Sequence, residues 1–176
     1  MVYDIPYIMN MKLTKKQILE LHSALLSVGN LKGVRFSYAV AKNLSSLATE
    51  VIALQKAYTT SKEFNEYDNE RIKLAEKHAE RVNGRPDLII TKDGLEKYNI
   101  KDEPKFFAEL KILQSKHETA IKNREDQLKE IDKILEEQVD IDLCKISIND
   151  IPEEIQAKQM ADLFMIVEDD KKKITN

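Results

Sequence analysis

The side chains best suited to chemistry in this chain are three histidines, one cysteine and several closely spaced acids. His22, His78 and His117 lie far apart, and no His-x-x-x-His or Glu-x-x-His pair gives metal-ligand spacing on a helix. Cys144 is the only cysteine, so it has no second thiol with which to build a thiolate site. A helical hairpin would bring His78 and His117 towards each other, but a surface or packing histidine is the commoner role. We therefore expect no metal site.

Other catalytic patterns are also missing from the sequence. Asp140 and Asp142 would share one solvent-facing side of a strand, and no third acid or basic clamp accompanies them. The four glycines form neither of the glycine-rich phosphate-binding motifs, G-x-x-x-x-G-K-S/T and G-x-G-x-x-G. No Gly-x-Ser-x-Gly elbow marks a nucleophile. We predict a protein that is not an enzyme and has no cofactor.

Two long segments, residues 36–83 and 104–138, carry apolar residues at steps of three and four. The first stripe consists of Val40, Leu44, Leu47, Val51, Leu54 and Tyr58, and the same register returns at Ile72, Ala75, Ala79 and Val82. The second consists of Phe106, Leu110, Leu113, Ile121, Leu128, Ile131 and Leu135. Such a repeat keeps one seam facing a partner helix. The sequence predicts a mainly α fold with a small β component: a long, coiled-coil-like antiparallel helical hairpin with flanking N- and C-terminal helices.

The first stripe is interrupted by a polar stretch. Phe64 and Tyr67 fall off the seam there, so we expect a stutter or break in the helix near residues 60–67. Both aromatic residues become candidate interaction residues. If the polar stretch is a passive interruption, Ser61→Ala or Asn65→Ala should change stability by less than about 0.5 kcal/mol.

A short β-hairpin is predicted at the tip of the helical pair, at about residues 84–100. Two strong turn dipeptides, Asn-Gly and Asp-Gly, bracket a run of three apolar residues. A two-stranded hairpin is marginal in water, and it cannot hide all three residues on one face. An open edge of this kind invites a second copy, so we expect a homo-oligomer. The candidate interaction residues of the hairpin are Leu88, Ile89 and Ile90.

Short signals near both ends complete the expected elements. Thr14 and Gln17 form a capping box that opens a helix. The alternation of apolar and acidic residues at 139–143 predicts a half-buried strand. Asp150 is placed to cap a last helix, which would use the apolar residues between 151 and 166 as its buried face.

The composition suits one domain of long, exposed helices. Charged residues make up 34% of the 176 residues and aromatic residues 6%, and there is no tryptophan. We predict a single helical-hairpin domain at residues 11–167, between a flexible extension at 1–10 and a disordered tail at 168–176.

The net charge disfavours nucleic acid as a partner but does not exclude it. A formal charge of −3 is too small to attract nucleic acid by the overall field. Basic residues nevertheless gather in 14–43, and acidic residues gather in 136–154. Nucleic-acid binding is therefore kept as a disfavoured alternative, with Lys15, Lys16, Lys32, Arg35 and Lys42 as the residues that would have to cluster.

Three features of the sequence favour the cytoplasm. No apolar run approaches the length of a membrane span, and no membrane partner is expected. The N-terminus lacks the positive charge and the long apolar core of a secretory signal. A single cysteine suits a reducing compartment.

Several stretches resemble an uncharacterised family of small proteins encoded by phages and prophages of Gram-positive bacteria. They are residues 11–19 (MKLTKKQIL), residues 34–51 (VRFSYAVAKNLSSLATEV), and the closing runs VDIDLCKISINDIP and QMADLFMIVED. The segment RVNGRPDLIITKDGLEKYNIKDEPKFFAEL looks like that family's turn and return helix. The resemblance covers most of residues 11–167 and carries no catalytic residues. It implies a phage or prophage origin and the cytoplasm of a bacterial host, with association with the virion as a further setting.

The order helix, β-hairpin, helix is also similar in architecture to prefoldin subunits, although fold does not fix function. We expect a non-enzymatic phage protein that binds another protein, as a virion or tail assembly accessory or a chaperone-like factor. The alternative is an inhibitor of a host antiphage defence protein.

Overall fold

The computed structural model describes residues 7–168. The chain forms two compact units, where the sequence analysis expects one domain. Unit 1 combines the chain up to Tyr58 with the chain from Ile131 onwards, and unit 2 is the intervening segment Thr59–Glu130. Each unit has its own secondary structure and its own packing, and each is considered separately below.

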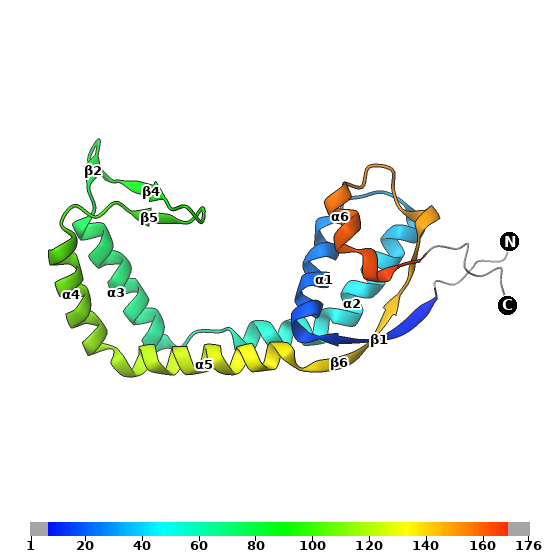
Figure 1. Ribbon diagram of the computed structural model, residues 1–176, viewed down its shortest axis with the longest axis horizontal. Coiled ribbons are helices and arrows are strands. Elements are labelled where there is room, and N and C mark those ends of the chain that lie inside the picture. The colour runs from blue at the N-terminus through cyan, green and yellow to red at the C-terminus, as the bar shows by residue number, and fades with distance from the viewer. Residues whose placement is uncertain (1–6, 169–176) are drawn as a thin grey trace. The chain divides into compact units, whose positions relative to one another are not determined.

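Unit 1 is a small α+β structure (Figure 1). Its elements are β1 (Ile8–Thr14), α1 (Lys15–Ser27), α2 (Val34–Ala57), β6 (Gln138–Cys144), β7 (Ile146–Ser147), α6 (Ala157–Asp162) and β8 (Val167–Glu168), with 3₁₀ turns at Ile148–Asp150 and Phe164–Ile166. The strand expected at 139–143 is confirmed as β6.

The two long strands of unit 1 come from distant parts of the sequence. β1 and β6 pair antiparallel along their whole length, from Ile8 opposite Cys144 to Thr14 opposite Gln138. Residues 8–10 are therefore part of a strand and not of a flexible extension. Residues 1–6 and 169–176, the rest of that extension and nearly all of the expected tail, lie outside the described residues.

The first helix begins where the sequence predicts. Thr14 accepts a hydrogen bond from the amide of Gln17 at 3.1 Å, and the Gln17 side chain accepts one from the Thr14 amide at 2.9 Å, so the capping box is confirmed. α2 begins after Gly33, whose φ of 140° is a conformation that other residues rarely adopt.

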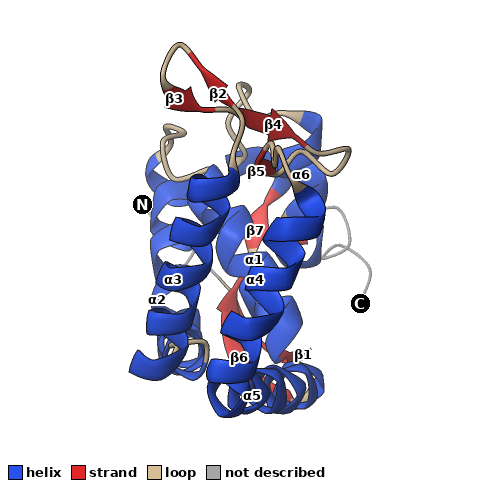
Figure 2. Ribbon diagram, turned by 90° about the vertical axis from the view of Figure 1, so that its left-hand side faces the viewer, coloured by secondary structure: helices blue, strands red, loops and turns tan. Residues whose placement is uncertain are grey.

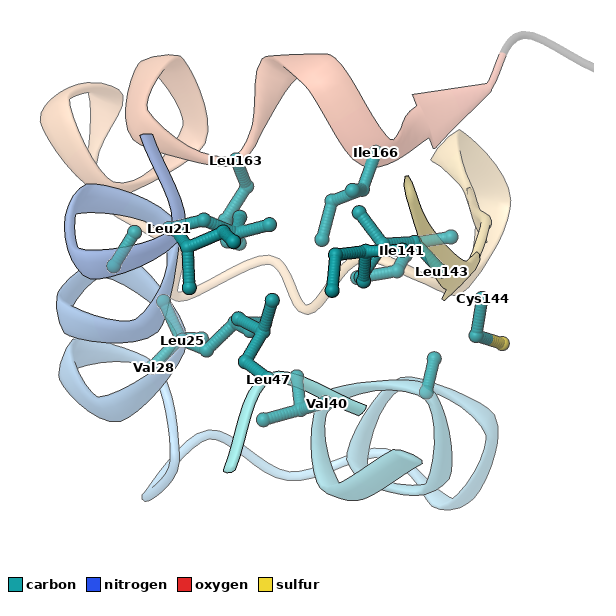
Figure 3. Close-up of a cluster of buried hydrophobic side chains, with 14 of the residues drawn as sticks. Leu21, Leu25, Val28, Val40, Leu47, Ile141, Leu143, Cys144, Leu163 and Ile166 are labelled. Atoms are coloured by element: carbon teal, nitrogen blue, oxygen red, sulfur yellow. The ribbon is translucent and has the colours of Figure 1, made fainter. Parts of the chain in front are cut away.

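The hydrophobic core of unit 1 lies between its helices and the β1–β6 pair. Figure 3 shows the side chains of α1, α2, β6 and the C-terminal segment converging on one cluster. Its fully buried members include Leu21, Leu25, Leu47, Leu143, Leu163 and Ile166. The apolar stripe of α2 is thus buried against α1 and β6.

Unit 2 is built around two paired helices with short strands at one end (Figure 2). Its elements are α3 (Lys62–His78), β2 (Arg81–Val82), β3 (Arg85–Pro86), β4 (Leu88–Ile90), β5 (Glu96–Tyr98), α4 (Glu103–Lys116) and the greater part of α5 (Glu118–Glu136). β4 and β5 pair antiparallel, from Leu88 opposite Tyr98 to Ile90 opposite Glu96, and they form the hairpin that the Asp-Gly dipeptide predicts.

The predicted long helical hairpin is wrong. The first segment is divided into α2 and α3, because the helix ends at Ala57 and Ser61 starts a new one by accepting a hydrogen bond from the Phe64 amide at 3.1 Å. The second segment is likewise divided at His117 into α4 and α5. Only α3 and α4 form a helical pair within unit 2. The part of the first stripe that lies on α2 is buried in the core of unit 1, whereas Ile72, Val82 and Leu128 of the predicted seam are exposed.

The last predicted helix is also shorter than expected. Asp150 ends a 3₁₀ turn that begins after Ser147, and it caps no helix. The α-helix starts only after Gln156, whose amide donates a hydrogen bond to Gln159 Oε1 at 3.0 Å, and it ends at Asp162. The apolar residues that reach the core here are Leu163, which lies between α6 and a second 3₁₀ turn, and Ile166, which ends that turn.

Candidate protein-binding surface

Unit 2 buries very little apolar surface. Among residues 59–130, all of which the structure describes, the buried side chains are Tyr67, His78, Ala79, Phe106 and Ala120. Its exposed large apolar residues are Ile72, Val82, Leu88, Ile89, Ile90, Leu95, Phe107, Ile112 and Leu128. Full burial of one such side chain is worth about 1.5–3 kcal/mol, so covering this surface with a partner would stabilise the complex.

The helical pair is an internal repeat. Residues 67–78 read YDNERIKLAEKH, and residues 106–117 read FFAELKILQSKH. Both contain an aromatic residue, a glutamate three positions later, a leucine four positions after that, and a Lys-His pair at the end. The repeat places equivalent side chains on α3 and α4, which pack antiparallel.

Each copy of the repeat contacts the other through its glutamate. Glu70 lies 2.8 Å from Lys116 Nζ and 3.4 Å from His117 Nε2. Glu109 lies 2.7 Å from Lys77 Nζ and 3.3 Å from His78 Nε2. The structure therefore contains two equivalent Glu–Lys–His clusters, one towards each end of the helical pair.

An aromatic ring packs against each of the two histidine rings. The Tyr67 ring is 5.7 Å from the His117 ring, and the Phe106 ring is 5.9 Å from the His78 ring. Both histidine Nε2 atoms are buried and make no hydrogen bond. Their short contacts to the glutamates become ion pairs when the imidazoles are protonated.

Each cluster joins α3 to α4 through contacts between charged side chains. The Lys116 ammonium, and secondarily His117, lowers the pKa of the Glu70 carboxyl, and Lys77 with His78 does the same for Glu109. Each cluster offers only one imidazole and one carboxylate, and the described residues contain no group of three or more His, Cys, Asp or Glu that could hold a metal. The geometry holds α3 against α4.

A cleft of about 370 Å³ lies between the helical pair and the β4–β5 hairpin. Its apolar lining includes Ile72 of α3, Ile89 of β4, and Phe106 and Phe107 of α4. Arg71, Glu96, Lys97 and Glu103 add charges to its lining. An apolar floor with a charged margin is the usual composition of a protein-binding site.

The far side of the hairpin is also apolar and uncovered. Leu88 and Ile90 are 52% and 73% exposed, and strand alternation places them on the face opposite Ile89. Hydrogen bonds from Asn99 N to Asp87 O (3.0 Å) and from Thr91 N to Leu95 O (2.8 Å) flank the strand pair. The alternation of an antiparallel ladder then turns the backbone groups of Leu88 and Ile90 away from β5. No other strand of the described residues pairs with β4.

The structure divides the sequence-predicted interaction residues into two groups. Leu88, Ile89 and Ile90 are exposed on the hairpin. Tyr67 is buried between the helices, and Phe64 is half-buried, with its ring 5.7 Å from Tyr67 and the Arg124 guanidinium 5.8 Å above it. Both aromatic residues thus pack within unit 2.

The geometry places residues of two other expectations. His78 and His117 lie in separate clusters, each facing the glutamate of the opposite helix. Of the basic residues considered for nucleic acid, Lys15 forms an ion pair with Glu137 at 2.8 Å. The repeat was not among the predicted features, although comparison of the chain with itself at an offset of 39 residues reveals it.

Comparison with known protein families, with curated proteins and with solved structures finds no match to this chain. In the part of the chain that the structure describes, no helix has the length and apolar character needed to cross a membrane.

Proposed function

We propose that this protein is a non-enzymatic interaction protein, and that unit 2 binds an extended apolar segment of another protein. The observation that carries the proposal is the uncovered β4–β5 hairpin, where Leu88 and Ile90 expose both their side chains and one edge of a strand. Exposed apolar residues on a free strand edge favour association with another chain.

The geometry favours strand addition as the mode of binding. A segment that pairs with the outer edge of β4 would make main-chain hydrogen bonds to Leu88 and Ile90. Its side chains would alternate between the two faces of the enlarged sheet. One set would cover Leu88 and Ile90, and the other would point to the side of the hairpin on which Ile89, Ile72 and Phe107 line the cleft.

The proposed biological setting rests on the resemblance of the sequence to phage and prophage proteins. We propose a role as an accessory factor in assembly of the virion or tail, with the partner a phage structural protein. Inhibition of a host defence protein would use the same surface with a different partner.

The test is affinity capture with the tagged full chain from lysates of infected and uninfected Gram-positive host cells. Leu88→Asp/Ile90→Asp places charges on side chains that are already exposed, so we expect it to fold and to lose the partner. A virion protein captured only after infection supports the assembly role. A host protein captured from uninfected cells supports the inhibitor role.

Lys92→Asp is the matched control, because Lys92 is an exposed residue of the same hairpin and the substitution changes the net charge by the same amount. We expect Lys92→Asp to retain the partner. If the wild type and the Leu88→Asp/Ile90→Asp variant capture the same proteins from both lysates, the hairpin is not the binding site and the proposal fails.

A further inference from the structure

A second apolar groove lies on the helical pair, away from the cleft. It has a volume of about 440 Å³, and Leu74 of α3 with Ile112 and Leu113 of α4 form its apolar part. The residues of α3 that line this groove include Glu70, Leu74 and Lys77. Those that line the cleft are Arg71, Ile72 and Ala75. The helical period of 3.6 residues places these two sets on opposite sides of α3.

The repeat gives this groove an approximate local two-fold symmetry, which is broken where Lys73 and Ile112 occupy equivalent positions. Leu74 and Leu113 occupy equivalent positions in the two copies and lie at its centre. Five charged residues line the groove around them: Glu70 beside Lys116 towards one end, Glu109 beside Lys77 towards the other, and Lys73 next to Leu74. Along each helix and between the helices, every glutamate is therefore next to a lysine.

We propose that this groove binds the same groove of a second copy of the chain, which gives a homodimer with a four-helix contact. Charge complementarity selects this occupant. If the second copy is related by a two-fold axis parallel to the helices, Glu70 faces Lys116 of the other copy and Lys77 faces Glu109. If the axis is perpendicular to the helices, Glu70 faces Lys77 and Glu109 faces Lys116. Each carboxylate meets an ammonium in both arrangements.

The apolar residues of the groove support the same conclusion. Ile112 is 72% exposed on a helix face where its neighbours Leu74 and Leu113 are only half-buried. A symmetric contact buries each of these side chains twice, once in each copy. The inference does not depend on the proposed binding to a foreign protein, because that binding uses the hairpin and the cleft.

The first measurement is the molar mass of the full chain by light scattering, from low micromolar to several hundred micromolar protein. We expect the mass of a dimer at the upper end. Ile112→Asp should weaken the dimer by roughly tenfold or more, because it removes an apolar contact and adds a charge in both copies. A monomer mass for the wild type at all concentrations would overturn the proposal.

Charge exchange tests the face directly. Glu70→Lys/Glu109→Lys makes every charge of the groove positive, and Lys77→Glu/Lys116→Glu leaves Lys73 as its only positive charge. We expect each double variant to be monomeric alone and the equimolar mixture to form a heterodimer. Circular dichroism of each variant checks that the helices remain. If a charge variant loses its helices, the molar mass of Ile112→Asp still tests the proposed contact.

Glu76→Lys/Glu118→Lys is the control, because it adds the same charge to exposed residues that do not line the groove. This variant should dimerise as the wild type does. The proposal fails if the wild type is a dimer, Ile112→Asp does not weaken that dimer, and the charge variants remain dimers alone and form no heterodimer when mixed. The dimer would then use another surface. The Leu88→Asp/Ile90→Asp variant should still dimerise, so failure of the dimer and failure of partner binding can be distinguished.

Discussion

The side-chain amide of Asn43 makes two hydrogen bonds to the backbone of Cys144. Asn43 Nδ2 donates to the Cys144 carbonyl at 2.9 Å, and Asn43 Oδ1 accepts from the Cys144 amide at 2.7 Å. Both residues are buried. Because β1 occupies the other edge of β6, the carboxamide takes the place of a neighbouring strand and satisfies backbone groups that water cannot reach.

Loss of the Asn43 amide should therefore destabilise unit 1. Asn43→Leu keeps the number and branching of the side-chain heavy atoms, but a buried N–H and a buried C=O lose their partners. We expect a loss of about 2–4 kcal/mol in the free energy of unfolding, measured by urea denaturation. Asn123→Leu, at an exposed position of α5, should change it by less than about 0.5 kcal/mol. Equal effects of the two substitutions would contradict this role of the amide.

The Cys144 thiol should be unreactive in the folded protein. Burial raises the pKa of this thiol, and Cys144 as a whole residue is only 2% exposed. Since the thiolate is the nucleophile, both effects slow its reaction with a disulfide reagent. We expect slow labelling of the native protein at pH 8 and fast, stoichiometric labelling in denaturant, followed by absorbance. Fast labelling of the native protein would show that the core around Cys144 opens readily.

Local signals predicted the elements that depend on local interactions. The Thr14 capping box, the turns at Gly84 and Gly94 and the strand at 139–143 each depend on residues close together in sequence. At both glycines φ is positive, 78° and 77°, as the Asn-Gly and Asp-Gly dipeptides lead one to expect.

Long-range pairing could not be predicted in the same way. The stripe through Val40, Leu47 and Val51 shows that one face of α2 is buried, but an apolar stripe does not identify its partner. The pairing of β1 with β6 joins residues at opposite ends of the chain, and only the folded core determines it. The repeat in α3 and α4, in contrast, could have been predicted, because both copies can be read from the sequence.

Leu47 should be among the most sensitive positions of unit 1. Its side chain is fully buried among α1, α2 and β6. Leu47→Ala should lower the free energy of unfolding by about 2–5 kcal/mol, the range for a leucine that leaves a cavity. Leu26→Ala, on the exposed side of α1, is the control and should cost much less. Urea denaturation of both variants makes the comparison.

The Ser61 hydroxyl changes one expectation from the sequence. Ser61 is the N-cap of α3 and accepts a hydrogen bond from the Phe64 amide at 3.1 Å. Ser61→Ala should therefore cost about 1 kcal/mol, whereas Ser61→Asp should keep the cap. Thermal melts followed by circular dichroism would compare them. If Ser61→Ala is neutral, the break between α2 and α3 does not depend on this hydrogen bond.

The two Glu–Lys–His clusters should make unit 2 sensitive to acid. Lysine and histidine partners lower the pKa of Glu70 and Glu109 in the folded state, so the folded state favours the carboxylates more than the unfolded state does. A lowered carboxyl pKa contributes stability above the unfolded value of 4.5, and this contribution disappears as the pH falls through the folded pKa. His78 and His117 face the same carboxylates, so protonation of each glutamate also removes the charge that faces an imidazole. Glu70→Gln/Glu109→Gln should therefore melt at a lower temperature than the wild type at pH 7, and the two melting temperatures should converge as the pH falls below the folded pKa of the glutamates. A difference that stays constant over this range would mean that the carboxylate charges do not hold α3 against α4.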